Sequence, residues 1–175
     1  MVARIIGTEH GFSRLDDERR GNAPQRIGRQ LYTARVNVSV DLLPHQPPMR
    51  LVEELVELVP GVRAHCRRQT KSDDWFFQGH FPGNPVVPAI VLIELVAQTG
   101  GLAAAAGEAA AGRPIRLRVA ALGSFKFQAT ASPGALLDAT ARVAGRLGGF
   151  YKIEGEVMAG RQMVASGSIT LAEPR

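Results

Sequence analysis

Two ionisable residues in one short segment could together carry out acid–base chemistry. Residues 79–101 read GHFPGNPVVPAIVLIELVAQTGG, with His80 near the start and Glu94 fourteen positions later. A neutral imidazole is a suitable base near neutral pH. A carboxyl group placed among apolar residues tends to stay protonated, so that it can donate a proton. A base and an acid of these types are what the elimination of water next to a carbonyl group requires.

The other candidate residues have less support, and a structural role for the pair stays open. A lone histidine in a loop is more often structural than catalytic, whereas a carboxyl group in an apolar helix is rarer and needs a partner. No spacing of His, Cys, Asp and Glu suits a metal, and no nucleophile elbow or dinucleotide-binding glycine loop occurs. The weaker candidates are His10, His45, His65 and Cys66.

A helix must position the acid. The segment from Ala89 to about Ala106 is apolar on all faces around Glu94, which predicts a buried helix. Pro88 is expected at its first helical position, where a missing N–H costs nothing. The helix could end at Gly107 or at Gly112, because alanine-rich sequence continues between these two residues.

The remaining segments predict an antiparallel sheet around this helix. Alternating apolar and polar residues on either side of Pro60-Gly61 predict a hairpin, and an aromatic helical turn is expected over 73–78. Short polar turns after the helix predict a meander of three or four strands. One helix enclosed by one curved antiparallel sheet is an α+β architecture. The predicted strands are 50–58, 61–69, 116–127, 135–147, 150–159 and 162–171.

The chain has the length of one domain. It contains 175 residues and one cysteine, so no intrachain disulfide is expected. Residues 1–35 are rich in charged residues and predict an N-terminal extension to a domain over 36–175. Within 25–40, a strand or short helix on the domain and a disordered tail are both open. The lack of an apolar leader or an unbroken apolar span predicts a cytoplasmic protein outside the membrane.

An excess of basic residues favours an acidic partner. The chain has 21 Lys and Arg against 16 Asp and Glu, a formal net charge of +5. Binding to nucleic acid would need a basic motif interleaved with aromatic residues, but only 6% of the residues are aromatic and no such motif occurs. The charge therefore does not support a nucleic-acid partner and leaves an acidic protein as the alternative.

The order of residues around His80 matches a known pattern. Residues 79–89 read GHFPGNPVVPA, and Glu94 and Gln98 follow in the next helix. This segment resembles the Gly-His-Phe-Pro-x-x-Pro-x-x-Pro-Gly motif and helical acid of the hotdog-fold β-hydroxyacyl-acyl-carrier-protein dehydratases of the FabZ type. The resemblance covers about 38–172. Its further matches are Leu42-Leu43-Pro44-His45, Phe125-Lys126-Phe127 and Ser132-Pro133-Gly134.

The resemblance implies a hotdog fold and dehydration of a (3R)-3-hydroxyacyl thioester to the trans-2-enoyl thioester. In this reaction His80 removes the C2 proton, and Glu94 protonates the leaving C3 hydroxyl or orients a water that does. The backbone N–H of Ala89 stabilises the enolate-like oxygen. No metal or other cofactor is expected, because the thioester itself acidifies the C2 proton. The other residues expected to bind substrate are Gly79, Phe81, Pro88 and Gln98.

The same resemblance implies an assembly and a partner. The catalytic pair is expected at a dimer interface, with His80 from one subunit and Glu94 from the other, in a homodimer or a trimer of dimers. The thioester is expected on acyl carrier protein, an acidic protein that a basic rim would attract. The residues expected in that rim are Arg116, Arg118 and Lys126.

One departure from the motif leaves alternatives open. Ala89 stands where the resembled family has glycine, so that a methyl group would face the substrate and a backbone that needs glycine would be strained. A non-catalytic paralogue or partner subunit that binds acyl carrier protein is one alternative, and a hotdog thioesterase is another. A FabA-type dehydratase-isomerase is less favoured, because that group has Asp at the position of Glu94. Fatty-acid synthesis and a polyene or polyketide pathway both fit the sequence.

Overall fold

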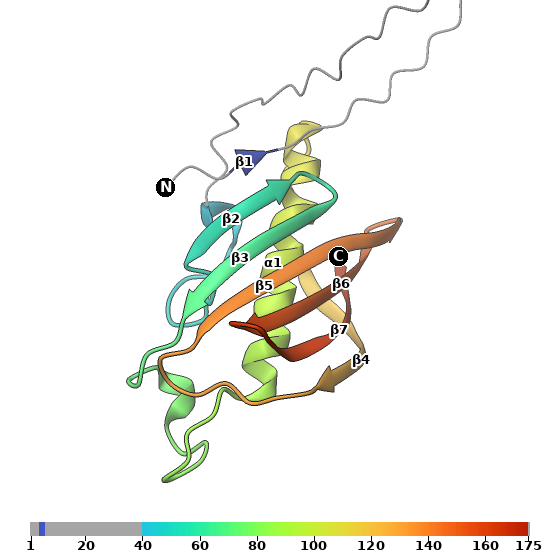
Figure 1. Ribbon diagram of the computed structural model, residues 1–175. Helices are drawn as coiled ribbons and strands as arrows, with labels where there is room; N and C mark the ends of the chain where they lie inside the picture. The colour runs from blue at the N-terminus through green and yellow to red at the C-terminus, as the bar shows by residue number, and fades with distance from the viewer. Residues whose placement is uncertain (1–3, 6–39, 175) are drawn as a thin grey trace, which may run out of the picture.

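The computed structural model describes residues 4–5 and 40–174 (Figure 1). The helix or strand predicted within 25–40 therefore lies outside the described residues, apart from Val40. The elements of the described part are β1 (Arg4–Ile5), η1 (Val40–Leu42), β2 (Glu54–Val59), β3 (Arg63–Gln69), η2 (Trp75–Phe77), α1 (Ala89–Ala110), β4 (Arg118–Phe127), β5 (Leu136–Leu147), β6 (Phe150–Ala159) and β7 (Gln162–Ala172).

The strands form a single sheet in the order β1-β2-β3-β5-β6-β7-β4. All neighbouring pairs are antiparallel except β1 with β2. The predicted hairpin is confirmed as β2 and β3, and β5, β6 and β7 form the predicted meander. β4 does not join this meander in chain order, because it pairs with β7 at the far edge. The chain after β4 then crosses the start of α1, where the N–H of Val87 donates to the carbonyl of Ala131 over 2.8 Å.

The sheet curves around α1, which confirms the predicted α+β architecture (Figure 1). Alternate residues of the strands point toward the helix, as the period of two in a strand requires. The residues of α1 that pack against the sheet include Leu92, Leu95 and Val96, all at most 3% exposed. The central strands contribute the buried residues Leu58, Ala64, Cys66, Leu137, Ala139, Ala141, Ile153, Val157, Val164, Ile169 and Leu171.

The N-terminal end of α1 differs slightly from the prediction, and its C-terminal end lies at the second of the two glycines left open. Pro88 is the N-cap residue rather than the first helical residue. The helix runs on through Gly107. This residue is glycine because it packs against the β2–β3 turn, where a Cβ would come within 2.5 Å of the Cα of Gly61. It ends before Gly112, whose φ of 74° allows the N–H of Arg113 to reach the carbonyl of Glu108 over 2.8 Å. This is the Schellman arrangement that glycine favours.

Among the described residues, α1 is the one helix long and apolar enough to cross a membrane, with a mean hydropathy of 1.7 in its most apolar window. Of that window, 67% is buried inside the fold. A helix enclosed by its own sheet in this way has the surroundings of a core helix.

A buried carboxylate fixes the C-terminal end of α1. Glu108 is 7% exposed and accepts a hydrogen bond of 2.8 Å from Nε of Arg113, while Arg146 pairs with its other oxygen. Burial opposes ionisation of this carboxyl. Hydrogen bonds from Arg113 and Tyr151 and the charges of Arg113 and Arg146 outweigh burial and hold the pKa of Glu108 below its ordinary value.

We expect Glu108→Gln to destabilise the protein more at neutral pH than in acid. Because the pKa of this group is lowered by folding, its contribution is complete above the unfolded value of about 4.3 and is lost as the pH falls through the folded value. Urea unfolding at several pH values should show a difference from wild type that narrows in acid. Glu156→Gln, at an exposed position, is the control. A difference in unfolding free energy between Glu108→Gln and wild type that stays constant with pH would contradict the expectation.

Candidate active site

His80 lies in the loop between η2 and α1, and one of its two ring nitrogens has no hydrogen-bond partner in the described chain. Its Nδ1 is 3.2 Å from the carbonyl oxygen of Val86, and its ring stacks on Phe81 with centroids 4.2 Å apart. A carbonyl oxygen only accepts hydrogen bonds, so Nδ1 must carry a proton. In the neutral ring this leaves the lone pair on Nε2, which has no partner among the described residues. The geometry therefore suits His80 to accept a proton at Nε2.

The backbone before His80 depends on glycine. Gly79 has a φ of 84°, and an added Cβ would meet no atom within 4 Å. We expect Gly79→Ala to lower activity, because a residue with a Cβ is strained by about 1–2 kcal/mol in this left-handed conformation. No steric clash adds to this strain. Comparison of kcat and thermal unfolding with Gly83→Ala tests this, since Gly83 also has a positive φ in open space two residues beyond Phe81. Equal losses in both variants would contradict a special role for Gly79.

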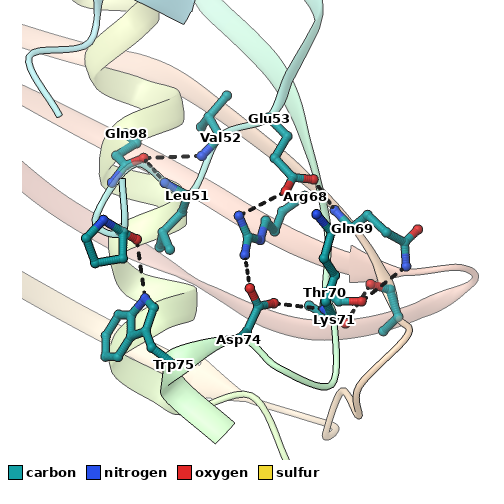
Figure 2. A network of polar contacts seen from close by, with 12 residues as sticks. Leu51, Val52, Glu53, Arg68, Gln69, Thr70, Lys71, Asp74, Trp75 and Gln98 are labelled. Carbon is teal, nitrogen blue, oxygen red and sulfur yellow. Dashed lines mark hydrogen bonds and ion pairs between the residues drawn. The ribbon is translucent and has the colours of Figure 1, made fainter. Parts of the chain in front are cut away.

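A polar network anchors the chain that leads to this loop (Figure 2). Arg68 of β3 lies between two carboxylates, at 3.0 Å from Glu53 and in a close ion pair with Asp74. Asp74 also accepts a hydrogen bond of 2.8 Å from the N–H of Lys71. Trp75 donates from its indole to the carbonyl of Pro48 over 3.3 Å. These contacts connect the loop before His80 to the sheet and to the segment before β2.

Glu94 lies in the second turn of α1 and is only half-buried. The sequence predicts an enclosed carboxyl here, but the side chain is 25% exposed, and the more deeply buried carboxylate of α1 is Glu108. Nε2 of Gln98 donates to Oε1 of Glu94 over 2.8 Å. Nε2 of His45 lies 3.4 Å from the same oxygen. Within the described chain, Oε2 has no partner, so one carboxyl oxygen is held and the other is available.

Gln98 is buried and its amide is fully used. It is 1% exposed. Its Oε1 accepts from the N–H groups of Leu51 and Val52 at 2.9 and 3.3 Å (Figure 2). Its Nε2 donates to the carbonyl of Met49 at 2.7 Å and to Glu94. An amide has two donors and two acceptor positions, so this set is complete. Because Leu51 and Val52 bond to α1 in this way, β2 begins at Glu54 rather than at residue 50.

A cavity of about 360 Å³ runs along α1 from Glu94. His45, Glu94 and Gln98 lie at its polar end, and most of the remaining wall is apolar. The apolar wall comes from η1 and the residues after it, from α1, and from the chain that leads into β4. The wall residues are Leu42, Leu43, Pro44, Met49, Ala97, Gly101, Ala105, Ile115, Leu117, Val119 and Leu171, with Arg118 as the other charged side chain.

The structure distributes the other predicted site residues widely. Ala89 is the first residue of α1 and is exposed, and its N–H has no acceptor among the described residues. Its backbone is helical, so the alanine is not strained there.

The basic residues predicted to form a rim are spread out. Arg118 lines the cavity, whereas Lys126 lies at the other end of β4, roughly 27 Å away at about 3.4 Å per residue. The exposed Arg116 precedes β4, so these side chains are spread along the chain that leads into and through β4 rather than gathered in one cluster.

His80 and Glu94 are not brought into contact within the chain. No hydrogen bond or ion pair connects them in the part of the chain that the structure describes, and His80 does not line the cavity. Instead, the structure brings to Glu94 a residue that sequence analysis ranked low, His45. The available signal was its place in the matched Leu42-Leu43-Pro44-His45 step. Cys66 lies in the core, where burial raises the pKa of its thiol to about 12 and outweighs the opposing effect of a hydrogen bond with Thr99.

Comparison with known proteins identifies the family of this chain. The family described as FabA-like domain matches residues 43–168. The 3-hydroxyacyl-acyl-carrier-protein dehydratase FabZ of Syntrophomonas wolfei is 35% identical over 131 residues, which are 75% of this chain and 90% of that protein. The FabZ of Chloroflexus aggregans is 40% identical over 93 residues, 53% of this chain and 63% of that protein.

Solved structures share the fold at lower identity. The dehydratase heterocomplex ApeI:P from Xenorhabdus doucetiae gives a TM-score of 0.67 at 20% identity, over 78% of this chain and 91% of that chain. The PaaI protein of E. coli, from the phenylacetic acid degradation operon, gives 0.55 at 15% identity, over 70% of this chain and 79% of that chain. These likenesses confirm the expected hotdog fold. The family match and the FabZ relatives go further: this chain belongs to the family of FabA-like domains and is a dehydratase.

Proposed function

We propose that this protein dehydrates (3R)-3-hydroxyacyl thioesters carried on acyl carrier protein to trans-2-enoyl thioesters. The names of the FabZ relatives support this substrate class. The observation that carries the proposal is the pair of complementary groups. His80 has its proton on Nδ1 and a free Nε2, and Glu94 has one oxygen held and the other free. The first suits a base and the second suits an acid.

The proposed reaction is a balanced elimination. Nε2 of His80 takes the proton from C2, and the electron pair of that C–H bond forms the C2–C3 double bond. The C3–O bond breaks, and Oε2 of Glu94 gives its proton to the departing hydroxyl, which leaves as water. The products are the enoyl thioester, a protonated His80 and an ionised Glu94. Proton exchange with water then restores both residues for the next turnover.

The start of α1 supports the negative charge that develops on the thioester oxygen. The N–H of Ala89 is unpaired at the helix N-terminus, where the helix dipole favours negative charge. Gly79, Phe81 and Pro88 surround His80 and this helix end, and we assign them to substrate positioning. Gln98 is buried and fully hydrogen-bonded, so its proposed part is to hold Glu94 rather than to contact the substrate.

The cavity along α1 is the proposed site for the acyl chain. Its polar end is formed by Glu94, and its walls beyond that point are mostly apolar. An apolar chain with C3 at Glu94 would leave water when it enters this cavity, and burial of each CH₂ would stabilise binding by about 0.8 kcal/mol. The assignment explains why the carboxyl group in the second turn of α1 lies at one end of an apolar space.

We propose a homodimer as the active form, with an assembly of three dimers as a larger alternative. His80 and Glu94 have separate surroundings within one chain, so a second subunit can supply the missing partner. β4 is an edge strand, exposed along almost its whole length, with the large apolar side chains Val119, Leu122 and Phe127 exposed. Antiparallel pairing of β4 with its copy would bury this edge and give the two-fold symmetry of most dimers.

Acyl carrier protein is the proposed macromolecular partner. The net charge of +5 favours an acidic protein, and such steering raises the rate of association more than the affinity. Arg116, Arg118 and Lys126 are the proposed contacts, spread along the chain that leads into and through β4. The proposal places the protein in the cytoplasm, in fatty-acid synthesis or a related polyene or polyketide pathway.

Turnover of defined thioesters tests the proposal. Crotonyl and longer enoyl thioesters, on acyl carrier protein and on coenzyme A, are offered to the wild-type protein, and hydration is followed by loss of enoyl absorbance. Hydration that is faster on the carrier protein supports the proposal. A folded wild-type protein that binds acyl carrier protein without turnover would instead be a non-catalytic partner subunit. Release of free thiol would indicate a thioesterase.

A further inference from the structure

We infer that His45 is a positioning residue for Glu94, which fixes which of its two carboxyl oxygens carries the acidic proton. The inference rests on the proposed dehydration. His45 belongs to the segment between η1 and β2, and Glu94 belongs to α1, so only the fold brings them together. Their closest atoms are Nε2 of His45 and Oε1 of Glu94, 3.4 Å apart at the polar end of the cavity.

The surroundings of the imidazole select one tautomer. Nδ1 of His45 is buried and has no hydrogen-bond partner among the described residues. A proton on Nδ1 would therefore be a buried donor without an acceptor, which is rare in folded proteins. With the proton on Nε2, the donor faces the carboxyl oxygen of Glu94 instead. The ring then presents an N–H to Glu94 and leaves only a lone pair in the apolar part of the site.

Two donors then converge on the same oxygen of Glu94. Gln98 donates to Oε1 over 2.8 Å from the same helix. Nε2 of His45 faces Oε1 from the segment between η1 and β2, at 3.4 Å. Oε1 accepts from Gln98 and faces the N–H of His45, so it is a poor site for a proton of its own, and the proton of the neutral acid belongs on Oε2. Oε2 is the oxygen without a partner in the described chain, and it is therefore free to meet the C3 hydroxyl.

The same two donors act again after proton transfer. When Oε2 has given up its proton, Glu94 becomes a carboxylate at the end of a mostly apolar cavity, where an unpaired charge is costly. Hydrogen bonds to a charged group are stronger than those to a neutral one. His45 and Gln98 therefore stabilise the product state more than the starting state. Arg118 is the other charged side chain in the wall of the cavity.

Two substitutions separate this role from simple packing. His45→Phe keeps a ring of similar size without a donor, and His45→Gln keeps an N–H at a similar reach with a different shape. We expect His45→Phe to lower kcat roughly 10- to 100-fold with KM changed less than about twofold, the range for loss of one donor that faces a charged group. We expect His45→Gln to recover most of that loss. If His45 only fills space, His45→Phe should instead retain more activity than His45→Gln.

A double-mutant cycle completes the test. In the Glu94→Gln background there is no acid for His45 to orient, so His45→Phe should cost little further activity. Thermal unfolding of each variant shows whether the fold is kept. Full kcat in His45→Phe, equal losses in Phe and Gln variants, or the same loss in both backgrounds would overturn the inference alone. A wild-type protein without turnover would overturn the proposed function and this role with it.

Discussion

His80→Ala and Glu94→Gln each lower kcat/KM by about 100- to 10,000-fold, the range expected when a general base or acid is removed. His80→Ala leaves no acceptor for the C2 proton. Glu94→Gln keeps the size of the side chain and a carbonyl oxygen that can accept from Gln98, but it removes the acidic proton. Hydration of an enoyl thioester on acyl carrier protein is the measurement, with secondary structure and thermal unfolding followed alongside.

Mixing the two inactive variants tests where the site lies. If each site takes His80 from one subunit and Glu94 from the other, a hybrid dimer holds one intact site and one doubly altered site. Random reassociation then restores about one quarter of the wild-type activity, because half of the dimers are hybrids and half of their sites are intact. No recovery, with exchange of subunits confirmed, would place both residues in one chain.

A matched change elsewhere controls for general damage. Glu156→Gln makes the same chemical change as Glu94→Gln at an exposed position of β6. It should leave turnover within about twofold of wild type, as surface substitutions usually do. Comparable losses in Glu156→Gln and Glu94→Gln would contradict a role for Glu94 as the acid.

Gln98→Leu lowers the free energy of unfolding by about 3 kcal/mol or more, because a buried polar group left without a partner costs about 1–3 kcal/mol. Leucine fits the helix and has a similar volume. It leaves the N–H groups of Leu51 and Val52 and the carbonyl of Met49 without their partner in α1. Urea unfolding of the wild type and the variant measures this loss.

The same variant lowers activity through Glu94. Loss of the donor at 2.8 Å releases Oε1 of Glu94, and small displacements of a catalytic group can cost about 100-fold in rate. Gln162→Leu, at the exposed start of β7, is the control for the change from amide to alkyl. A Gln98→Leu protein as stable as wild type would show that the segment before β2 is held by other contacts.

Much of α1 and of its motif could be predicted from the sequence, because both depend on neighbouring residues. An apolar run that follows Pro88 and contains no helix-breaking proline specifies a buried helix locally. The end of the helix was narrowed to Gly107 or Gly112 by residue type, and packing of Gly107 on Gly61 leaves the left-handed turn to Gly112. The hairpin and the meander were predictable for the same reason, since short turns force adjacent strands to pair.

The surroundings of the acid were not predictable, since they come from residues far apart in the sequence. Gln98 meets Met49, Leu51 and Val52 across 46 to 49 residues of chain. His45 meets Glu94 across a similar separation, and no pattern within either segment indicates that contact. The position of β4 beside β7 was equally out of reach, because periodicity predicts a strand but not its neighbour.

Residue types and their spacing therefore predict which residues could do the chemistry, whereas packing between distant segments sets what surrounds those residues. His80 and Glu94 are predicted from residue type and from their spacing along one loop and one helix. The choice of Oε1 of Glu94 as the held oxygen depends on two donors, one on the same helix and one from the segment before the sheet. Packing of that segment on α1 brings the second donor to the acid, because Gln98 satisfies backbone groups that would otherwise be buried without partners.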